Sequence, residues 1–257
     1  MKTINKLMKV NFFRRILTSI LKKYVSLTNN YKVKIKYNNV LFNLDLREQI
    51  DRRLYLHGTY EENLIKTANK IIKENKFDYF LDIGACWGIY SLMIASKNKK
   101  VKIYAFDPIR SNIDRLNESV KENNFSNINP HRLAIGKQKG KIKLGVSDVH
   151  SSVYRINNKN SKKIEISPIN SLDNLFKFKD KKIFIKIDVE DYEIPVLEGA
   201  RKLLQNNKCL VQIEYLEEQK KVINNHFLKF GYKIISIPKT EFWDVYFSNF
   251  FTKKVYL

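Results

Sequence analysis

Hydrophobic and polar positions alternate along the chain with two different periods, which predict strands and helices in turn. From Phe80 onward, short continuous apolar runs alternate with stretches in which apolar residues recur every three or four positions. The expected strands are 77–83, 101–106, 128–134, 181–188, 208–215, 232–237 and one within 243–248, and the expected helices are 87–97, 109–123, 193–205 and 217–230. This order predicts βαβ units and an α/β fold with a mostly parallel sheet.

Three other segments complete the predicted organisation. Residues 31–46 alternate in part and contain Asn38-Asn39, which predicts a short hairpin, and residues 61–75 have helical spacing. The interval 137–176 is polar and short-stranded, and we expect it to be an insertion over the strand ends. We therefore divide the chain into a basic N-terminal extension, 1–55, and one main domain, 56–257.

The N-terminal extension contains a predicted amphipathic helix. Its apolar residues recur at helical spacing and its other positions are mostly basic. The apolar residues are Phe13, Ile16, Leu17, Ile20, Leu21 and Tyr24, and the basic ones are Lys9, Arg14, Arg15, Lys22 and Lys23. These charges interrupt the run, so neither a membrane-spanning helix nor a secretory signal is expected. Either the helix docks on the protein's own core or on a second copy of the chain as a homodimer, or it contacts an anionic membrane surface peripherally.

Composition excludes some classes of protein and leaves one open. The chain has 257 residues, a formal net charge of +22 and 44% hydrophobic residues, so it is too apolar for a disordered basic tail. Two cysteines cannot make a disulfide framework, which favours a reducing, cytoplasmic location. The charge suggests a nucleic-acid partner. However, residues 1–44 hold ten Lys and Arg residues and no acid, so much of the excess belongs to the N-terminus.

The residues that follow the first expected strand favour a nucleoside ligand without a pyrophosphate. In an open parallel sheet, ligands bind outside the carboxyl ends of the strands. Gly84 and Gly88 permit a tight turn and close approach of a ligand there, and Asp82 adds a carboxylate. The spacing is GxxxG and not the GxGxxG of dinucleotide sites. A ligand that carries an ammonium and a sulfonium suits this acidic rim, and the alternative is an ordinary strand-to-helix turn.

Acidic residues follow the other expected strands. Asp107 can accept hydrogen bonds from ribose hydroxyls, or can cap the helix that Pro108 opens, and both roles can coexist. Asp188 and Glu190 follow a strand expected to be buried on both faces, where acids are costly unless they bind a cation or move protons. Glu214 ends the next strand at the same rim.

At this point the sequence resembles a known family. The strings FLDIGACWGIYSL, YAFDP, Ala134-Ile135-Gly136, His150-Ser151-Ser152 and IKIDVEDYEIPVLEGA are similar to those of the FkbM family of S-adenosylmethionine-dependent methyltransferases, over roughly residues 56–237. Tyr60-Glu61 matches a pair often found upstream. Two residues depart from the family pattern: Asp191 stands where Gly is usual, and Asp107 replaces the more usual Glu.

The resemblance implies a fold, a cofactor and a set of site residues. It implies a Rossmann-like class I methyltransferase with seven strands, one of them antiparallel, and helices on both faces. It also implies methyl transfer from S-adenosylmethionine to a hydroxyl of a sugar, glycan or related small molecule. The residues implied are Asp82, Gly84, Ala85, Trp87 and Gly88 for the methionine end of the donor, Asp107 for the ribose, Ala134 and Ile135 for the adenine, and Asp188 and Glu190 for the transfer site.

A hydroxyl acceptor must lose its proton as the new bond forms. We expect Asp188 to be the general base. His150 from the insertion is either its assistant or an ordinary surface histidine. The other histidines, His57, His131 and His226, are scattered singly with no HxxxH spacing, so no metal site is predicted.

Three competing functions have different signatures in the sequence. An RNA or DNA methyltransferase would use the basic surface, but nucleic acid is disfavoured because Asp107-Pro108-Ile109 departs from the Asp-Pro-Pro-Tyr pattern of amine methylation. A nicotinamide oxidoreductase is disfavoured by the missing GxGxxG. A non-catalytic binding protein on the same fold stays open, because fold alone does not establish activity.

Overall fold

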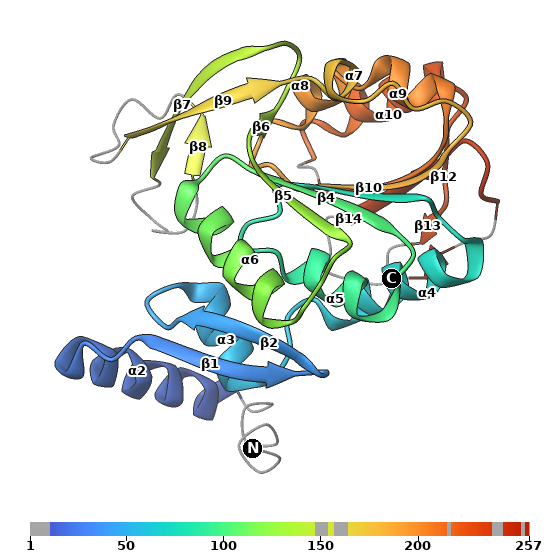
Figure 1. Ribbon diagram of the computed structural model, residues 1–257. Coiled ribbons are helices and arrows are strands. Elements are labelled where there is room, and N and C mark those ends of the chain that lie inside the picture. The colour runs from blue at the N-terminus through green and yellow to red at the C-terminus, as the bar shows by residue number, and fades with distance from the viewer. Residues whose placement is uncertain are drawn as a thin grey trace.

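The computed structural model describes residues 11–146, 154–156, 164–214, 217–237, 244–252 and 255–256. A seven-stranded sheet runs through its centre (Figure 1). Its strands, in spatial order, are β12 (Lys233–Ile234), β14 (Asp244–Ser248), β11 (Lys208–Glu214), β10 (Lys182–Ile187), β3 (Tyr79–Ile83), β4 (Lys102–Asp107) and β5 (Ile128–Arg132). β14 is antiparallel to both of its neighbours, β12 and β11, and all other neighbouring strands of this sheet are parallel to each other. The predicted mostly parallel α/β sheet with one antiparallel strand is confirmed.

Helices cover both faces of this sheet, because alternate side chains of each buried strand are apolar on both sides. One core contains Phe80, Phe184 and Leu210 and is covered by α4 (Glu62–Asn75), α5 (Ile89–Lys97) and α6 (Arg110–Glu122). The other contains Leu81, Ile185 and Val211. It is covered by α7 (Leu172–Leu175), α8 (Glu193–Glu198), α9 (Arg201–Asn206) and α10 (Lys220–Lys229), as Figure 1 shows.

The single helix expected over 193–205 is wrong in one respect, since the chain forms two helices there. They meet at Gly199, where a Cβ atom would lie only 2.0 Å from the carbonyl oxygen of Gly136. The close passage of the Gly136 backbone therefore fixes a glycine at this point and interrupts the helix.

Two expected strands also divide between sheets. The segment 232–237 becomes β12 and β13 (Ser236–Ile237), and β13 pairs with β15 (Val255–Tyr256) outside the central sheet. The segment 128–134 becomes β5 and β6 (Ala134–Ile135). β6 joins a second sheet with the insertion strands β9 (Ile164–Asn170), β7 (Gly140–Val146) and β8 (Tyr154–Ile156). The short-stranded insertion expected over 137–176 is therefore present.

An N-terminal lobe, residues 11–57, packs against the α4–α6 side of the sheet (Figure 1). It consists of α2 (Asn11–Thr28), the hairpin β1 (Lys32–Tyr37) and β2 (Val40–Asp45), and α3 (Gln49–His57). Asn38 and Asn39 both have positive φ, 48° and 67°, as a two-residue hairpin turn requires, so the expected hairpin is confirmed. The proposed division between residues 55 and 56 falls inside α3, a helix that the sequence pattern did not predict.

The hairpin contributes directly to the main core. Val40, Phe42 and Leu44 are buried in the same cluster as Phe80, and the rings of Phe42 and Trp87 meet edge to face with centroids 5.8 Å apart. Among the described residues, no helix combines the length and the apolar character needed to cross a bilayer.

Candidate active site

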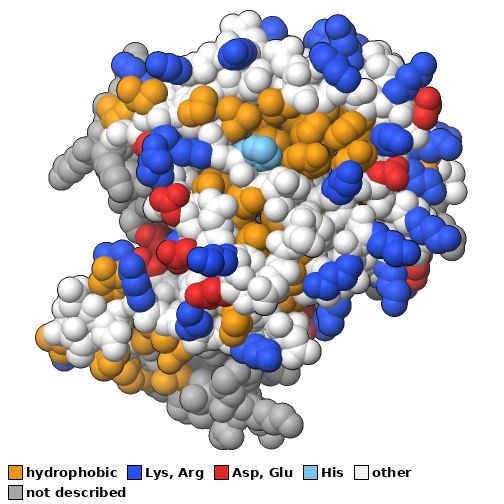
Figure 2. All heavy atoms as spheres, viewed as in Figure 1, with side chains coloured by type: hydrophobic (Ala, Val, Ile, Leu, Met, Phe, Trp, Pro, Cys, Tyr) orange, Lys and Arg blue, Asp and Glu red, His pale blue; other side chains and the backbone are white. Residues whose placement is uncertain are grey.

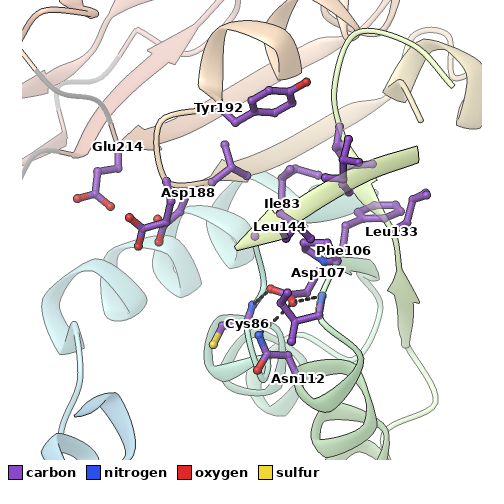
Figure 3. Close-up of a pocket in the computed structure, with 18 of the residues that line it drawn as sticks. Ile83, Cys86, Phe106, Asp107, Asn112, Leu133, Leu144, Asp188, Tyr192 and Glu214 are labelled. Carbon is purple, nitrogen blue, oxygen red and sulfur yellow. Dashed lines mark hydrogen bonds between the residues drawn. The ribbon is translucent and has the colours of Figure 1, made fainter. Parts of the chain in front are cut away.

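A cavity of about 350 Å³ opens at the carboxyl ends of β3, β4, β10 and β11, the edge at which the sequence places its acids. Its wall is formed by Ile50, Tyr60, Glu61, Ile83, Gly84, Cys86, Phe106, Asp107, Pro108, Ile109, Asn112, Leu133, Ala134, Ile135, Ile142, Leu144, Asp188, Val189, Glu190, Tyr192 and Glu214. Five of these described residues are acidic and none is Lys, Arg or His. Figure 3 shows Asp188 and Glu214 on one side of the cavity and Asp107 with Asn112 on another.

The turn after β3 brings two strand ends into contact. Gly84 has φ +81°, and a Cβ atom there would lie 1.8 Å from the carbonyl oxygen of Asp188. The Asp188 N–H in turn donates to the carbonyl oxygen of Ile83 at 3.0 Å. Only glycine fits between the two strand ends, so the turn residue and the acid motif are parts of one structure.

Asp107 organises the floor of the cavity through its carboxylate. One oxygen accepts hydrogen bonds from the Ile109 N–H at 2.9 Å and from the Asn112 amide at 3.0 Å, and the other accepts from the Cys86 N–H at 2.9 Å. Burial raises the pKa of Asp107 to about 7, against the effect of these donors. Asp107 thus caps the start of α6 and also lines the cavity.

A row of polar residues crosses four neighbouring strands beneath the cavity. The strand register aligns Asp82 with Lys186, Lys186 with Gln212, and Gln212 with Tyr246, all on the face toward α5. The Tyr246 hydroxyl donates to Gln212 at 2.9 Å, and Gln212 donates to Asp244 at 2.7 Å. Such a buried row is stable only if its members satisfy one another.

Asp82 is fully buried within this row. One carboxylate oxygen accepts a hydrogen bond from the Ser91 hydroxyl at 2.6 Å, whereas Oδ1 has no hydrogen-bond partner among the described residues. Burial raises the pKa of Asp82, and the positive charge of Lys186 opposes that rise. Asp82 lines a smaller cavity of about 50 Å³ beside the main one, together with Ala85, Trp87 and Lys186.

Lys186 is the cation that balances these acids. Its ammonium lies 2.7 Å from the Asp188 carboxylate and 4.7 Å from the centroid of the Tyr90 ring. Burial lowers the pKa of Lys186, but the negative charges of Asp188 and Asp82 outweigh this effect and hold it well above its usual value. For Asp188, burial raises the pKa, but the positive charge of Lys186 lowers it by more, so the pKa of Asp188 lies below its usual value.

Glu214 stands beside Asp188 at the ends of adjacent strands. Ile187 and Ile213 are paired in the register, so Asp188 and Glu214 are each one residue beyond that pair. Their side chains share a hydrogen bond, and burial together with the charges of Asp188 and Asp244 raises the pKa of Glu214 to about 8. The two carboxyl groups consequently hold one proton between them near neutral pH.

The structure brings together most of the residues singled out in the sequence. The main cavity is lined by Gly84, Asp107, Ala134, Ile135, Asp188 and Glu190, and the smaller one by Asp82, Gly84, Ala85, Trp87 and Asp188. Gly88 lines neither of these two cavities. It has φ +87° and packs on Leu116, where a Cβ atom would lie 2.2 Å from a side-chain carbon. His150 falls outside the described residues.

Several wall residues had no role assigned from sequence. Glu61 and Ile50 reach the cavity from outside the βαβ pattern, and Ile142 and Leu144 come from the insertion. Lys186 did carry a signal, because a lysine inside an apolar strand must find a counter-charge. No cluster of His, Cys, Asp and Glu with metal-binding geometry occurs in the described part of the chain.

Comparisons with known proteins give one match over most of this region. A sequence model of the methyltransferase FkbM domain matches residues 82–234. No curated protein sequence is significantly similar to the chain.

Several solved structures are similar to this chain at low sequence identity. The structure of M. jannaschii TYW2 in complex with AdoMet is 14% identical, covers 85% of this chain and 84% of its own, and has a TM-score of 0.45. Trm5b from Pyrococcus abyssi is 15% identical over 85% of this chain and 54% of its own, with a TM-score of 0.44. The Pyrococcus abyssi tRNA (uracil-54, C5)-methyltransferase bound to S-adenosyl-L-homocysteine is 10% identical over 85% and 43%, with a TM-score of 0.47.

Proposed function

Because the chain belongs to the FkbM methyltransferase family and uses S-adenosylmethionine as methyl donor, we propose that it methylates a hydroxyl oxygen of a sugar, glycan or related small molecule. The family match covers more than half of the chain and includes all of the strand ends that line the cavity. The wall residues Ile50, Tyr60 and Glu61 lie before the matched range.

The charge of the cavity wall is the observation that supports this acceptor class. The chain carries a net charge of +22, yet the described wall has five carboxyl side chains and no basic residue. Figure 2 shows Lys and Arg spread over one face and acidic side chains gathered where the N-terminal lobe meets the body of the protein. An acidic cavity repels a phosphodiester backbone and suits a cationic donor with a neutral, hydroxylated acceptor.

The residues present fit S-adenosylmethionine. We assign the ribose hydroxyls to Asp107, which lines the cavity, and the adenine to the apolar side chains of Phe106, Leu133 and Ile135. We assign the methionine end to the glycine cradle at Gly84 and to Oδ1 of Asp82, which has no partner among the described residues. When bound, the cofactor supplies an electrophilic methyl group on a positively charged sulfur.

The Asp188–Glu214 pair is our candidate for removing the acceptor's proton. Lys186 keeps Asp188 ionised and fixed in position, which makes Asp188 suited to orient a hydroxyl but a weak base. Glu214, with a pKa of about 8, is the stronger base of the two once it is deprotonated. We therefore propose that the form in which Glu214 has lost its proton is the active one. In this form Asp188 orients the acceptor hydroxyl, Glu214 receives its proton, and Glu190 lines the same transfer site.

Methyl labelling tests this proposal. The full chain is incubated with S-adenosylmethionine carrying a tritiated methyl group and with separated fractions of glycans, lipid-linked oligosaccharides, small-molecule extract and RNA. We expect label in a hydroxylated fraction, recovered as an O-methyl group after acid hydrolysis. We expect at least about a tenfold slower transfer by Asp188→Asn. Glu217→Gln, a change at an exposed acid outside the cavity, serves as the matched control.

Two results would contradict the proposal. Label that enters only RNA would assign the enzyme to nucleic acid, and label recovered on nitrogen would exclude hydroxyl methylation. Unchanged transfer by Asp188→Asn at saturating acceptor would remove Asp188 from the transfer site.

A further inference from the structure

The helix α2 of the N-terminal lobe has a broad apolar surface, and among the described residues only one side of this surface is packed. Val25 is buried and Leu17 and Leu21 are half-buried on the side where α2 contacts α3. On this side α2 packs against the protein itself. Figure 1 shows α2 along the outer side of the hairpin.

The adjoining side of this apolar surface is a stripe of exposed residues. Ile16, Ile20, Tyr24 and Leu27 are exposed by 40%, 59%, 49% and 75%. At 3.6 residues per turn these four side chains fall within an arc of about 80° and extend over about 16 Å of helix. Figure 2 shows hydrophobic side chains over this edge of the lobe. A continuous exposed stripe of large residues marks an interaction surface, unlike scattered single ones.

The charges around the stripe identify the kind of partner. Lys23 is exposed beside the stripe, about 20° around the helix from Ile16, and Lys22 is exposed on the far side of the helix from the stripe. The whole stretch 1–44 holds ten Lys and Arg residues and no acid. A second copy of this stripe would bring like charges together, whereas an anionic lipid surface would neutralise them.

We propose that the exposed stripe of α2 binds the surface of an anionic phospholipid bilayer, with Ile20, Tyr24 and Leu27 entering the headgroup boundary, Lys23 contacting lipid headgroups and Lys22 adding to the positive charge of the lobe. An amphipathic helix with a basic polar face lies in the plane of the interface and does not cross it. The same lobe supplies Ile50 to the cavity wall, so binding of the lobe attaches the protein to the membrane through a part of the chain that also lines the cavity. This inference is independent of the methyl acceptor.

Vesicle co-sedimentation tests the proposal directly. The full-length chain is mixed with extruded vesicles of phosphatidylcholine alone or of phosphatidylcholine with phosphatidylglycerol in equal parts, at low and high salt. We expect binding to the anionic vesicles only, with weaker binding at high salt because exposed charges are screened. The double variant Ile20→Asn/Leu27→Asn should bind at least about tenfold more weakly than the unchanged chain.

A matched control separates the stripe from general surface hydrophobicity. Val222 and Leu228 are exposed by 51% and 60% on α10, so Val222→Asn/Leu228→Asn removes similar side chains on the other side of the molecule. This control should bind anionic vesicles as the unchanged chain does. Lys22→Gln/Lys23→Gln keeps the apolar stripe and should reduce the preference for anionic over neutral vesicles, which tests the charge contribution separately. Calorimetric binding of S-adenosylmethionine reports whether each variant is folded.

Each contrary outcome overturns the inference. The proposal is wrong if the unchanged chain ignores anionic vesicles, or if the α2 variant, still binding S-adenosylmethionine, sediments with them as before. A chain that forms dimers in analytical ultracentrifugation, dissociates on Ile20→Asn/Leu27→Asn and does not bind vesicles would assign the stripe to self-association. Binding to an RNA oligonucleotide that depends on Ile20 and Leu27 while vesicles are ignored would assign it to nucleic acid.

Discussion

The ammonium of Lys186 lies 2.7 Å from the carboxylate of Asp188, two residues further along the same strand end. Both residues line cavities together with other carboxyl side chains. Lys186 is the only basic residue in the described walls of these two cavities. The arrangement keeps one acid ionised next to a second acid, Glu214, that holds a proton. The ionisation of Asp188 therefore depends on a lysine that is itself buried.

Replacing Lys186 should destabilise the protein. Lys186→Met leaves Asp82 and Asp188 without their counter-charge, and breaking a buried pair in this way costs roughly 2 to 3 kcal/mol of unfolding free energy. Urea unfolding at neutral pH measures the loss, with the exposed Lys143→Met as control. Because Lys186 holds the pKa of Asp188 below its usual value, this stabilisation is present at neutral pH and is lost as the pH falls. Equal stability of both variants would contradict the role of Lys186.

The stability of the unchanged protein should fall as the pH rises from about 4.5 to about 8. Glu214 has a usual pKa of 4.5 and a folded pKa of about 8, so over this range the folded state retains a proton that the unfolded state has released. Unfolding then releases a proton, and its free energy decreases with increasing pH. Glu214→Gln removes this contribution, and its denaturant midpoints should depend less steeply on pH. A variant with the same pH dependence would show that Glu214 titrates normally.

Asp107→Ala should impair both the turn and donor binding. The backbone N–H groups of Cys86 and Ile109 lose their acceptor, which costs about 2 kcal/mol of stability. Loss of the ribose contact should weaken S-adenosylmethionine binding by about tenfold or more, as calorimetric titration would show. Asp114→Ala, on the exposed side of α6, should leave both quantities unchanged. Donor binding that survives in a folded Asp107→Ala protein would leave Asp107 with the capping role alone.

Gly84→Ala should be poorly tolerated. The new methyl group would meet the Asp188 carbonyl oxygen at 1.8 Å and the residue would also have to adopt φ +81°, for a combined cost of about 3 kcal/mol. Because the displaced atom belongs to the Asp188 backbone, methyl transfer should fall together with the melting temperature. At Gly140, where the nearest contact of an added Cβ is 3.7 Å, the same substitution should change stability by less than about 1 kcal/mol. Similar melting temperatures for the two variants would contradict this assignment.

The sequence alone determined the order of strands and helices and the edge of the sheet at which the acidic residues and the cavity lie. Apolar runs such as 181–188 are buried on both faces, so their period gives the parallel core without any knowledge of packing. Acids at strand ends, such as Asp107 and Asp188, were recognisable because a carboxylate at a buried strand end needs a partner. Local chemistry was sufficient for these features.

Only the tertiary structure decided which partner each acid has. The alignment of Lys186 with Asp82 and the hydrogen bond between Asp188 and Glu214 depend on strand register, and the contribution of Ile50 to the cavity depends on a lobe that is distant in sequence. The break at Gly199 depends on the approach of another backbone segment, and the helical period cannot reveal it. Periodicity reports the environment of a residue along its own segment, whereas charge balance and close contacts arise between segments and exist only once the chain has folded.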